Sequence, residues 1–336
     1  MSGVENVVEV ARHLRSGDRR VLARAITTAE STRAEDREHS AALMDEVIAS
    51  TGSSYRVGVS GAPGAGKSTF IEALGMHLVS VGLSVAVLAV DPSSARTGGS
   101  ILGDKTRMEE LARCPQAFIR PSPSGGTLGG VARRTREALL LCEAAGFDVV
   151  LVETVGVGQS EVAVAAMVDT FVLLLAPAAG DELQGVKRGI MELADIIVVN
   201  KNDGDLAASA TRTAADYANA AHFLRPRTAH WETKVLLCSA LLNQGVDEIW
   251  ATIMAHREAL AVDDQLQRLR ADQASEWMYS EISESLLDSL KADTKLDGLL
   301  ARLDADVRSG LVSPAAGALD VLRAFRALPP GQPSAS

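Results

Sequence analysis

Residues 61–69, GAPGAGKST, have the types and spacing of a loop that binds phosphate. They match G-x-x-x-x-G-K-[ST], and they stand between an apolar run and a helical pattern, as that motif requires. Glycines let backbone N–H groups curl around phosphates, and the helix that follows adds a positive dipole end. A chance Gly-rich turn is the alternative interpretation. Lys67 is expected to reach the β- and γ-phosphates, and Ser68 to bind Mg²⁺. The predicted nucleotide-binding residues are Gly61, Ala62, Pro63, Gly64, Ala65, Gly66, Lys67, Ser68 and Thr69.

Acidic residues follow further apolar runs. Asp91 comes directly after residues 85–90, Glu153 ends the run 148–153, and Asp104 lies in a Gly-rich segment between them. A phosphate loop needs an acid from another strand end to hold Mg²⁺, directly or through water. Each acid alone would also suit a helix cap or a solvated loop. Together with the phosphate loop they predict a Mg²⁺ site.

Gly156, in the stretch ETVG, has the properties of a switch. Its N–H is expected to meet the γ-phosphate, and its freedom in φ lets the loop change conformation after hydrolysis. Ras-like enzymes carry a water-positioning glutamine directly after this glycine, whereas this chain has Val157, and its nearest glutamine is Gln159. We therefore expect slow intrinsic hydrolysis that a partner accelerates; whether Gln159 has a catalytic role is left open.

The stretch VVNKND, residues 198–203, predicts a pocket for guanine. Asp203 can accept two hydrogen bonds, from N1–H and the exocyclic amine of guanine, and adenine lacks both donors in that arrangement. The stem of Lys201 can cover the base, and Asn200 can tie the loop together. A polar turn is the alternative. A second loop, CSALLNQG, follows the next apolar run and is expected to offer N–H groups to guanine O6, from Ser239, Ala240 and Leu241.

Short apolar runs alternate with helical patterns from residue 55 onward. The runs are residues 55–60, 85–90, 148–153, 171–176, 196–200 and 234–239. Continuous apolar strands that alternate with helices are typical of an α/β fold with a mainly parallel sheet covered on both faces. Ligands bind such sheets at the carboxyl ends of the strands, and the polar motifs follow the strands as this requires.

Helical segments flank the alternating region. We predict a helical extension at 1–52, a nucleotide-binding domain at 53–258, a helical arm at 259–327 and a disordered tail at 328–336. On the arm, four apolar residues at a spacing of four form one stripe: Met278, Ile282, Leu286 and Leu290. This stripe either packs against the main domain or forms a dimer interface.

Composition excludes some classes of function. With 33 basic and 43 acidic residues, the net charge is −10, which argues against binding to nucleic acid through bulk charge. The charged N-terminus and scattered cysteines suit a cytoplasmic protein. The apolar segment 162–180 contains Asp169 and Thr170, so a helix followed by a buried strand explains it better than a membrane span.

These motifs together resemble the MeaB/ArgK/MMAA family of P-loop GTPases. The resemblance covers nearly the whole chain and rests on six stretches: GAPGAGKSTFIEALG, VLAVDPSS, GGSILGDKTRM, ETVGVGQSE, GDELQGVKRGIMELADIIVVNKND and CSALLNQGVDEIW. It implies a homodimeric GTPase, working with GTP/GDP and Mg²⁺, that gates adenosylcobalamin loading and protects an adenosylcobalamin-dependent acyl-CoA mutase, chiefly methylmalonyl-CoA mutase.

The resemblance also implies roles for individual residues. Asp91, Asp104 and Glu153 would belong to the Mg²⁺ and hydrolysis site, with Lys67 and Gly156. The segment GDELQGVKRG would report the nucleotide state to the mutase, through Asp181, Glu182, Gln184 and Lys187. Without the family, this segment is merely a loop that opens a helix.

Two other functions remain as alternatives. Metal-insertion GTPases that serve hydrogenase and urease share the phosphate loop, but they need cysteine or histidine ligands at a dimer interface, and the six histidines here are scattered. A kinase of an amino-acid-binding transport protein is the second, and the guanine motif argues against it because such a kinase would use ATP.

Overall fold

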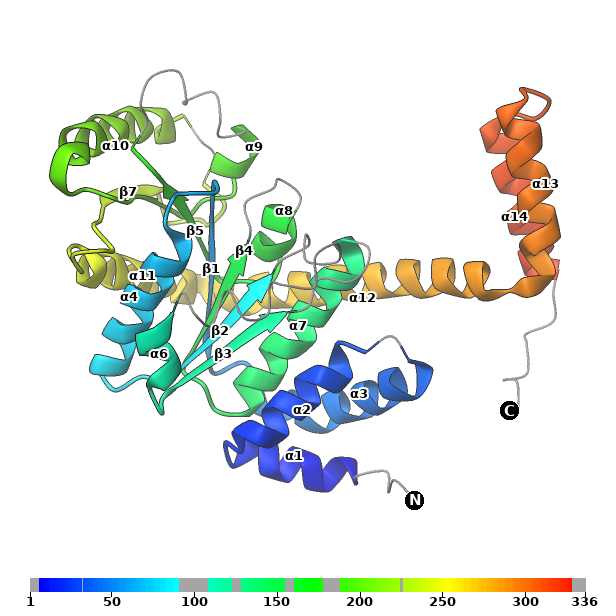
Figure 1. Ribbon diagram of the computed structural model, residues 1–336, viewed down its shortest axis with the longest axis horizontal. Helices are drawn as coiled ribbons and strands as arrows, with labels where there is room; N and C mark the ends of the chain where they lie inside the picture. Colours follow the sequence, from blue (N-terminus) through cyan, green and yellow to red (C-terminus); the bar gives the residue numbers. More distant parts are fainter. Residues whose placement is uncertain are drawn as a thin grey trace. The chain divides into compact units, whose positions relative to one another are not determined.

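A computed structural model describes residues 6–31, 33–90, 108–122, 128–154, 160–177, 188–223 and 226–327. Its core is a sheet whose seven strands all pair in parallel, in the order β3-β2-β4-β1-β5-β6-β7 (Figure 1). The strands are β1 (Tyr55–Gly61), β2 (Val85–Val90), β3 (Ala117–Ser122), β4 (Val149–Thr154), β5 (Thr170–Leu175), β6 (Ile196–Val199) and β7 (Lys234–Leu237). The predicted α/β fold is confirmed.

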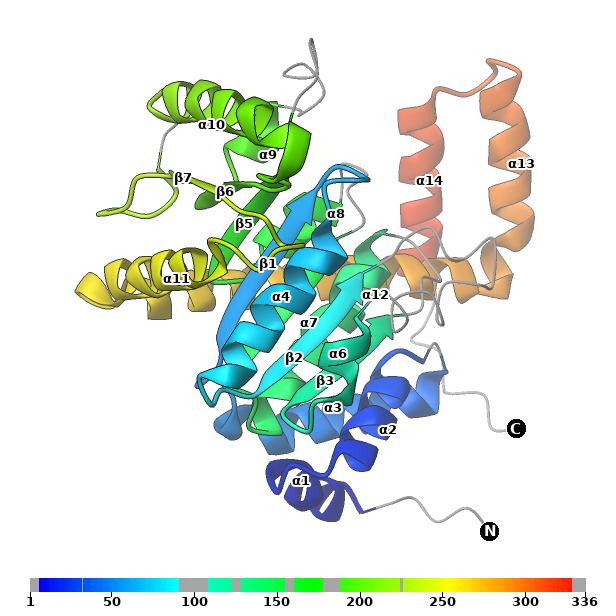
Figure 2. The same cartoon turned by 60° about the vertical axis from the view of Figure 1, so that its left-hand side comes forward.

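Helices cover both faces of this sheet. Figure 2 shows α4, α6 and α11 on one face and α7 on the other, where α8 packs against α7 and β4. The helices are α1 (Val7–Arg15), α2 (Arg19–Ala29), α3 (Ala34–Val47), α4 (Lys67–Ser80), α6 (Glu109–Arg113), α7 (Leu128–Ala144), α8 (Ser160–Ala165), α9 (Arg188–Met191), α10 (Ala207–Ala221), α11 (Val246–Ala261), α12 (Gln265–Ala292), α13 (Asp297–Arg308) and α14 (Pro314–Ala327). This two-sided cover explains why β1, β4, β5 and β6 are apolar on both faces.

The six predicted strands are present, with small shifts at their ends, but β3 was missed. Its sequence, AFIRPS, contains Arg120 and Pro121, which interrupt the apolar pattern. β3 lies at an edge of the sheet, where proline is tolerated because one side of the strand needs no ladder hydrogen bonds.

The N-terminal helices cover this edge. Asp18 caps α2 by accepting from the Arg20 and Val21 amides. Arg19, the first residue of α2, donates to the Ala117 carbonyl of β3 at 2.7 Å. At the other end of this helix, Glu30 pairs with Arg120. Side chains of the helical extension therefore satisfy and shield the strand that sequence reasoning missed.

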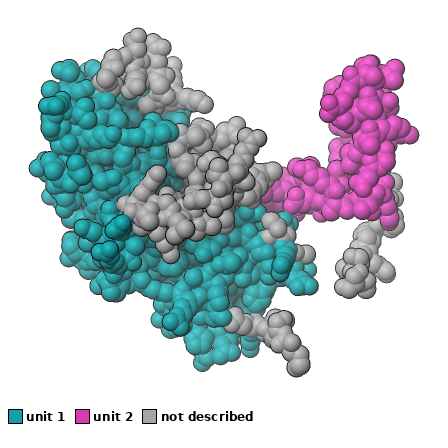
Figure 3. All heavy atoms as spheres, in the orientation of Figure 1, with its two compact units in different colours: residues 1–274 teal, residues 275–336 magenta. Residues whose placement is uncertain are grey.

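The chain forms two compact units, residues 1–274 and 275–336 (Figure 3). The division falls within α12, so its first turns, predicted as part of the arm, belong to the first unit. In the second unit α13 and α14 pack together, and Leu303 and Val321 are buried there. The expected boundaries at residues 52 and 258 stay predictions, and the tail 328–336 lies outside the described residues.

The apolar segment 162–180 contains the end of α8 and strand β5, as expected from its central acid. Asp169 is 2% exposed and binds Arg270. In the parts of the chain that the structure describes, no helix is both long and apolar enough to cross a bilayer.

Candidate functional site

The phosphate loop connects β1 to α4 at the carboxyl end of the sheet. Gly61 ends β1 so close to β5 that an added Cβ would lie 2.2 Å from the Leu174 carbonyl oxygen. Gly66 caps α4 with φ +88°, and a Cβ there would lie 2.6 Å from Nδ2 of Asn200. Only glycine suits these two positions, and the motif places the N-terminus of α4 at the loop as predicted.

Lys67 is buried at the start of α4, with 9% of its surface exposed. Its Nζ donates to the carbonyls of Gly61 at 2.7 Å and Ala62 at 3.2 Å. Burial lowers the pKa of Lys67, while the carboxylates of Glu153 and Glu161 oppose that shift. The ammonium therefore lies within the phosphate loop, and two nearby acids stabilise its charge.

Ser68 and Glu153 lie together, although the sequence separates them by 85 positions. The Ser68 hydroxyl donates to Oε1 of Glu153 at 3.2 Å. Glu153 is 8% exposed near the end of β4, the neighbour of β1 in the sheet. The parallel order brings these two predicted Mg²⁺ ligands to one place.

Glu161 was not predicted as a site residue. It is the last residue of ETVGVGQSE, lies in the first turn of α8, and is 2% exposed. Its charge acts on Lys67. The position of a glutamate at the end of that motif was the signal, but its spacing alone did not show that α8 packs back toward β1 and β4.

Asn200 joins the phosphate loop to the loop after β7. Its Nδ2 donates to the Ala65 carbonyl at 2.9 Å, and its Oδ1 accepts from the Ala240 amide at 3.0 Å. The side chain is 3% exposed. The predicted tie is thus present, and it links three loops from three parts of the sequence.

Asp203 is positioned by the second loop. The Ser239 hydroxyl donates to Oδ2 of Asp203 and accepts from the Leu242 amide at 3.2 Å. Lys201 adopts a left-handed conformation, φ 58°, and its Cε would lie 4.0 Å from a Cβ at Gly66. The lysine stem therefore borders the phosphate loop, and the second loop holds the aspartate.

The second loop uses two of its three predicted N–H donors internally. The Ser239 amide donates to the Gln244 carbonyl and the Ala240 amide to Asn200. Among the described residues, none accepts from the Leu241 amide. Leu241 is 77% exposed, so its backbone is the donor best placed to meet a base.

Comparison with known proteins agrees with this geometry. A family model described as Methylmalonyl Co-A mutase-associated GTPase MeaB matches residues 22–295. The chain belongs to this family. The MeaB match runs from α2 to the turn after α12, so it includes the phosphate loop, both base loops and the sheet between them. The resemblance seen in the motifs is confirmed.

Relatives in the MeaB family match over almost the full chain. A protein named "Putative GTPase" from Caulobacter vibrioides is 52% identical over 95% of this chain and 98% of its own. "Methylmalonic aciduria type A homolog, mitochondrial" of Mus musculus is 48% identical over 92% of this chain and 77% of its own. A solved structure titled "Crystal structure of LAO/AO transport system kinase" is 41% identical, with a TM-score of 0.78, and covers 97% of this chain and 99% of that one.

Several predicted MeaB-type site residues lie outside the described residues. These are Asp91, Asp104, Gly156, Gln159, Asp181, Glu182, Gln184 and Lys187. The described part of the site therefore consists of the phosphate loop, Glu153, Glu161 and the two base loops.

Proposed function

We propose that this protein binds GTP with Mg²⁺, hydrolyses it slowly, and uses the cycle to serve a cobalamin-dependent acyl-CoA mutase. The observation that most supports guanine over adenine is the contact between Ser239 and Asp203. A carboxylate held in place can accept from both donors of guanine, whereas adenine would leave it unpaired. The family's GTPase description and the guanine motif support the same choice.

The donors at Ser68 and Glu153 suit Mg²⁺. A hydroxyl and a carboxylate, 3.2 Å apart, are the hard oxygen ligands that Mg²⁺ takes beside nucleotide phosphates. Ser68 and Glu153 would hold the ion directly or through water, with Asp91 and Asp104 as further proposed ligands. The ion would neutralise charge on the β- and γ-phosphates.

The chain's own groups supply the remaining chemistry. The phosphate-loop amides and the ammonium of Lys67 would stabilise charge that develops as water attacks the γ-phosphate in line. To do so, Lys67 exchanges its bonds to the Gly61 and Ala62 carbonyls for phosphate oxygens. Val157 stands where a water-positioning glutamine would be, which supports a slow intrinsic rate.

The proposed client is an acyl-CoA mutase, and methylmalonyl-CoA mutase is the first candidate. The family's description names that association, and a relative carries the name of methylmalonic aciduria. We propose that GTP binding and hydrolysis gate adenosylcobalamin loading and protect the mutase, with residues 181–187 as the reporting switch. The cytoplasm is the proposed place of action.

A homodimer formed through the arm is part of the proposal. Met278, Ile282 and Leu286 of α12 are 53%, 47% and 56% exposed in the single chain. The alternative is that this stripe packs against the main domain, and the oligomeric state of the protein decides between the two. A second copy is the partner that would remove them from water.

The deciding experiment measures GTP hydrolysis by the purified protein, alone and with the methylmalonyl-CoA mutase of the same organism. Slow turnover that the mutase accelerates is the expected result. Slow turnover that the mutase leaves unchanged would retain the GTPase and reject this client. Turnover as fast alone as with the mutase would contradict the proposed partner-activated switch.

Two competing activities are tested alongside. One solved relative is titled a transport system kinase, so transfer of labelled phosphate from ATP and from GTP to an amino-acid-binding protein is measured. Titration with Ni²⁺ tests the metal-insertion alternative. The proposal expects neither phosphotransfer nor stoichiometric nickel binding.

A further inference from the structure

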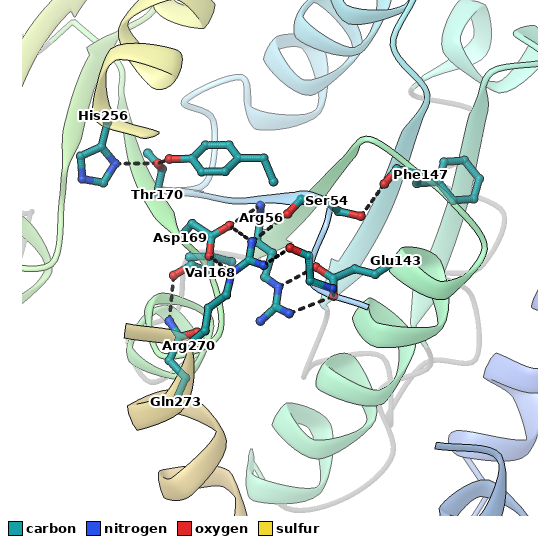
Figure 4. A network of polar contacts seen from close by, with 12 residues as sticks. Ser54, Arg56, Glu143, Phe147, Val168, Asp169, Thr170, His256, Arg270 and Gln273 are labelled. Carbon is teal, nitrogen blue, oxygen red and sulfur yellow. Dashed lines mark hydrogen bonds and ion pairs between the residues drawn. The ribbon is translucent and has the colours of Figure 1, made fainter. Parts of the chain in front are cut away.

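A buried polar cluster lies at the end of the sheet opposite the phosphate loop, where β1 and β5 begin (Figure 4). Arg270 of α12 is at its centre. Its Nε and Nη2 donate to the two carboxylate oxygens of Asp169 at 2.8 and 2.7 Å. The same guanidinium donates to the carbonyls of Gly52 at 2.6 Å and Ser54 at 2.7 Å. We call these four residues the Arg270 clamp.

The clamp joins segments that are far apart in the sequence. Gly52 and Ser54 lead into β1, and Asp169 directly precedes β5. Asp169 also accepts from the Arg56 amide of β1 at 2.8 Å. A single guanidinium on α12 thus binds the starts of two neighbouring strands.

A second ion pair lies beside the Arg270 clamp. The Arg56 guanidinium forms two bonds to Glu143 of α7, at 2.8 and 2.9 Å, and Glu143 also accepts from the Gly52 amide at 3.0 Å. The side chains of Glu143 and Asp169 are 0% exposed. Forked charge-assisted bonds of this kind fix orientation as well as distance.

The first turns of α12 have a further anchor. Nε2 of Gln273 donates to the Val168 carbonyl at 2.9 Å. The helix continues without interruption to Ala292, and its residues from Ser275 onward belong to the second compact unit. Whatever displaces the starts of β1 and β5 therefore acts on the helix that leads into that unit.

The far ends of the same two strands lead to the nucleotide site. β1 ends in the phosphate loop, and β5 ends shortly before the proposed switch at 181–187. The strands pair from Val57 with Thr170 to Gly61 with Leu174. This paired stretch is about 13 Å long, at roughly 3.3 Å per residue. The tight approach of Gly61 to the Leu174 carbonyl means that neither strand end moves alone.

We propose that the Arg270 clamp transmits the nucleotide state from the phosphate loop, through β1 and β5, to α12 and so to the C-terminal helical unit. The proposal rests on the guanine-nucleotide binding proposed above. It makes Arg270 a positioning residue that touches no nucleotide, and it makes α12 the output of the GTP cycle.

The test compares amide hydrogen exchange over residues 276–292 with GDP and with a non-hydrolysable GTP analogue, using the full chain in its native oligomeric state. The unaltered protein is expected to show at least a several-fold difference in exchange rate between the two nucleotides. Arg270→Lys keeps the positive charge but loses the planar guanidinium, whose N–H donors bind both carboxylate oxygens of Asp169 at once. It should reduce that difference below about twofold while both nucleotide Kd values stay within about threefold.

Two further variants keep the test decisive. Arg268→Ala changes an exposed arginine on the same helix and should leave the difference intact. Arg270→Met combined with Asp169→Asn leaves no unpaired buried carboxylate and keeps an acceptor for the Arg56 amide, so it serves if Arg270→Lys fails to fold.

Two results would overturn the proposal. In one, the clamp variants retain the nucleotide-dependent difference. In the other, the unaltered protein binds both nucleotides and shows no difference. Failure to bind any guanine nucleotide would instead refute the proposed function as well, so the two failures are distinguishable.

Discussion

Asp203 is the residue whose replacement tests the base pocket most directly. Hydrogen bonds to a charged acceptor are worth about 1.5–3 kcal/mol each, so losing two should lower GTP affinity on the order of 10²-fold or more. Asp203→Asn should therefore bind GTP weakly and prefer xanthosine triphosphate, measured by calorimetric titration with both nucleotides.

The neighbouring Asn202 provides the control for this prediction. In the pattern N-K-x-D, which residues 200–203 match, Asn202 occupies the variable position x. Its backbone amide donates to the Cys238 carbonyl at 2.9 Å. Asn202→Ala keeps that bond and should bind GTP normally. An Asp203→Asn protein that still strongly preferred GTP would show that the pocket lies elsewhere.

His256 predicts a pH dependence of stability. It is fully buried on α11, 2.7 Å from Thr170 Oγ1 through Nδ1, and burial lowers its pKa to about 4. The unfolded chain takes up this proton near pH 6.5, whereas the folded chain does so only near pH 4. Acidification below pH 6.5 therefore destabilises the fold through His256, by about 2 kcal/mol at pH 5.

His256→Gln removes this group, so the cost of the substitution should be smaller at pH 5 than at pH 8, measured by urea unfolding at both values. Asp195, whose burial raises its pKa to about 6, acts in the opposite direction in both proteins. Because Nε2 of His256 lies 3.7 Å from Oδ1 of Asp195, the comparison is repeated in an Asp195→Asn background, which removes that opposing titration. A cost equal at both pH values would contradict the assigned direction.

Among the elements, the covered edge strand β3 gives a testable prediction about the free energy of unfolding. Arg19 crosses from α2 to the Ala117 carbonyl, and a bond from a charged donor is worth about 1.5–3 kcal/mol. Arg19→Ala should lower the free energy of unfolding by about that amount. The adjacent Arg20 is exposed, and Arg20→Ala should change it by less than about 0.5 kcal/mol. Equal effects of the two substitutions in urea unfolding would mean that the edge contact contributes nothing specific.

For the whole molecule, the α12 stripe predicts the oligomeric state. Ile282→Asp places a charge in the middle of the exposed apolar stripe, so it should weaken self-association on the order of 10²-fold, because an unpaired buried charge costs several kcal/mol. Light scattering across a concentration series measures this. Ser280→Glu, on the opposite side of the same helix, should leave association unchanged. A monomeric unaltered protein would refute the dimer.

Much of the site was predictable because its motifs are local. The phosphate loop needs glycines at fixed offsets and a strand and a helix on either side, and residues 55–80 contain all of these in one stretch. The parallel sheet was predictable for a similar reason, since strands covered on both faces must be apolar throughout. Asn200 and Asp203 were found because they directly follow such a strand.

The rest depended on which strands become neighbours. Pairing of β1 with β4 brings Glu153 to Ser68, and the packing of α8 brings Glu161 toward Lys67. The edge position of β3 explains why Arg120 and Pro121 are tolerated there. The Arg270 clamp joins residues separated by up to 218 positions. A local pattern specifies the conformation and chemistry of one segment, but contacts between distant segments exist only once the sheet order has decided which strand ends lie together.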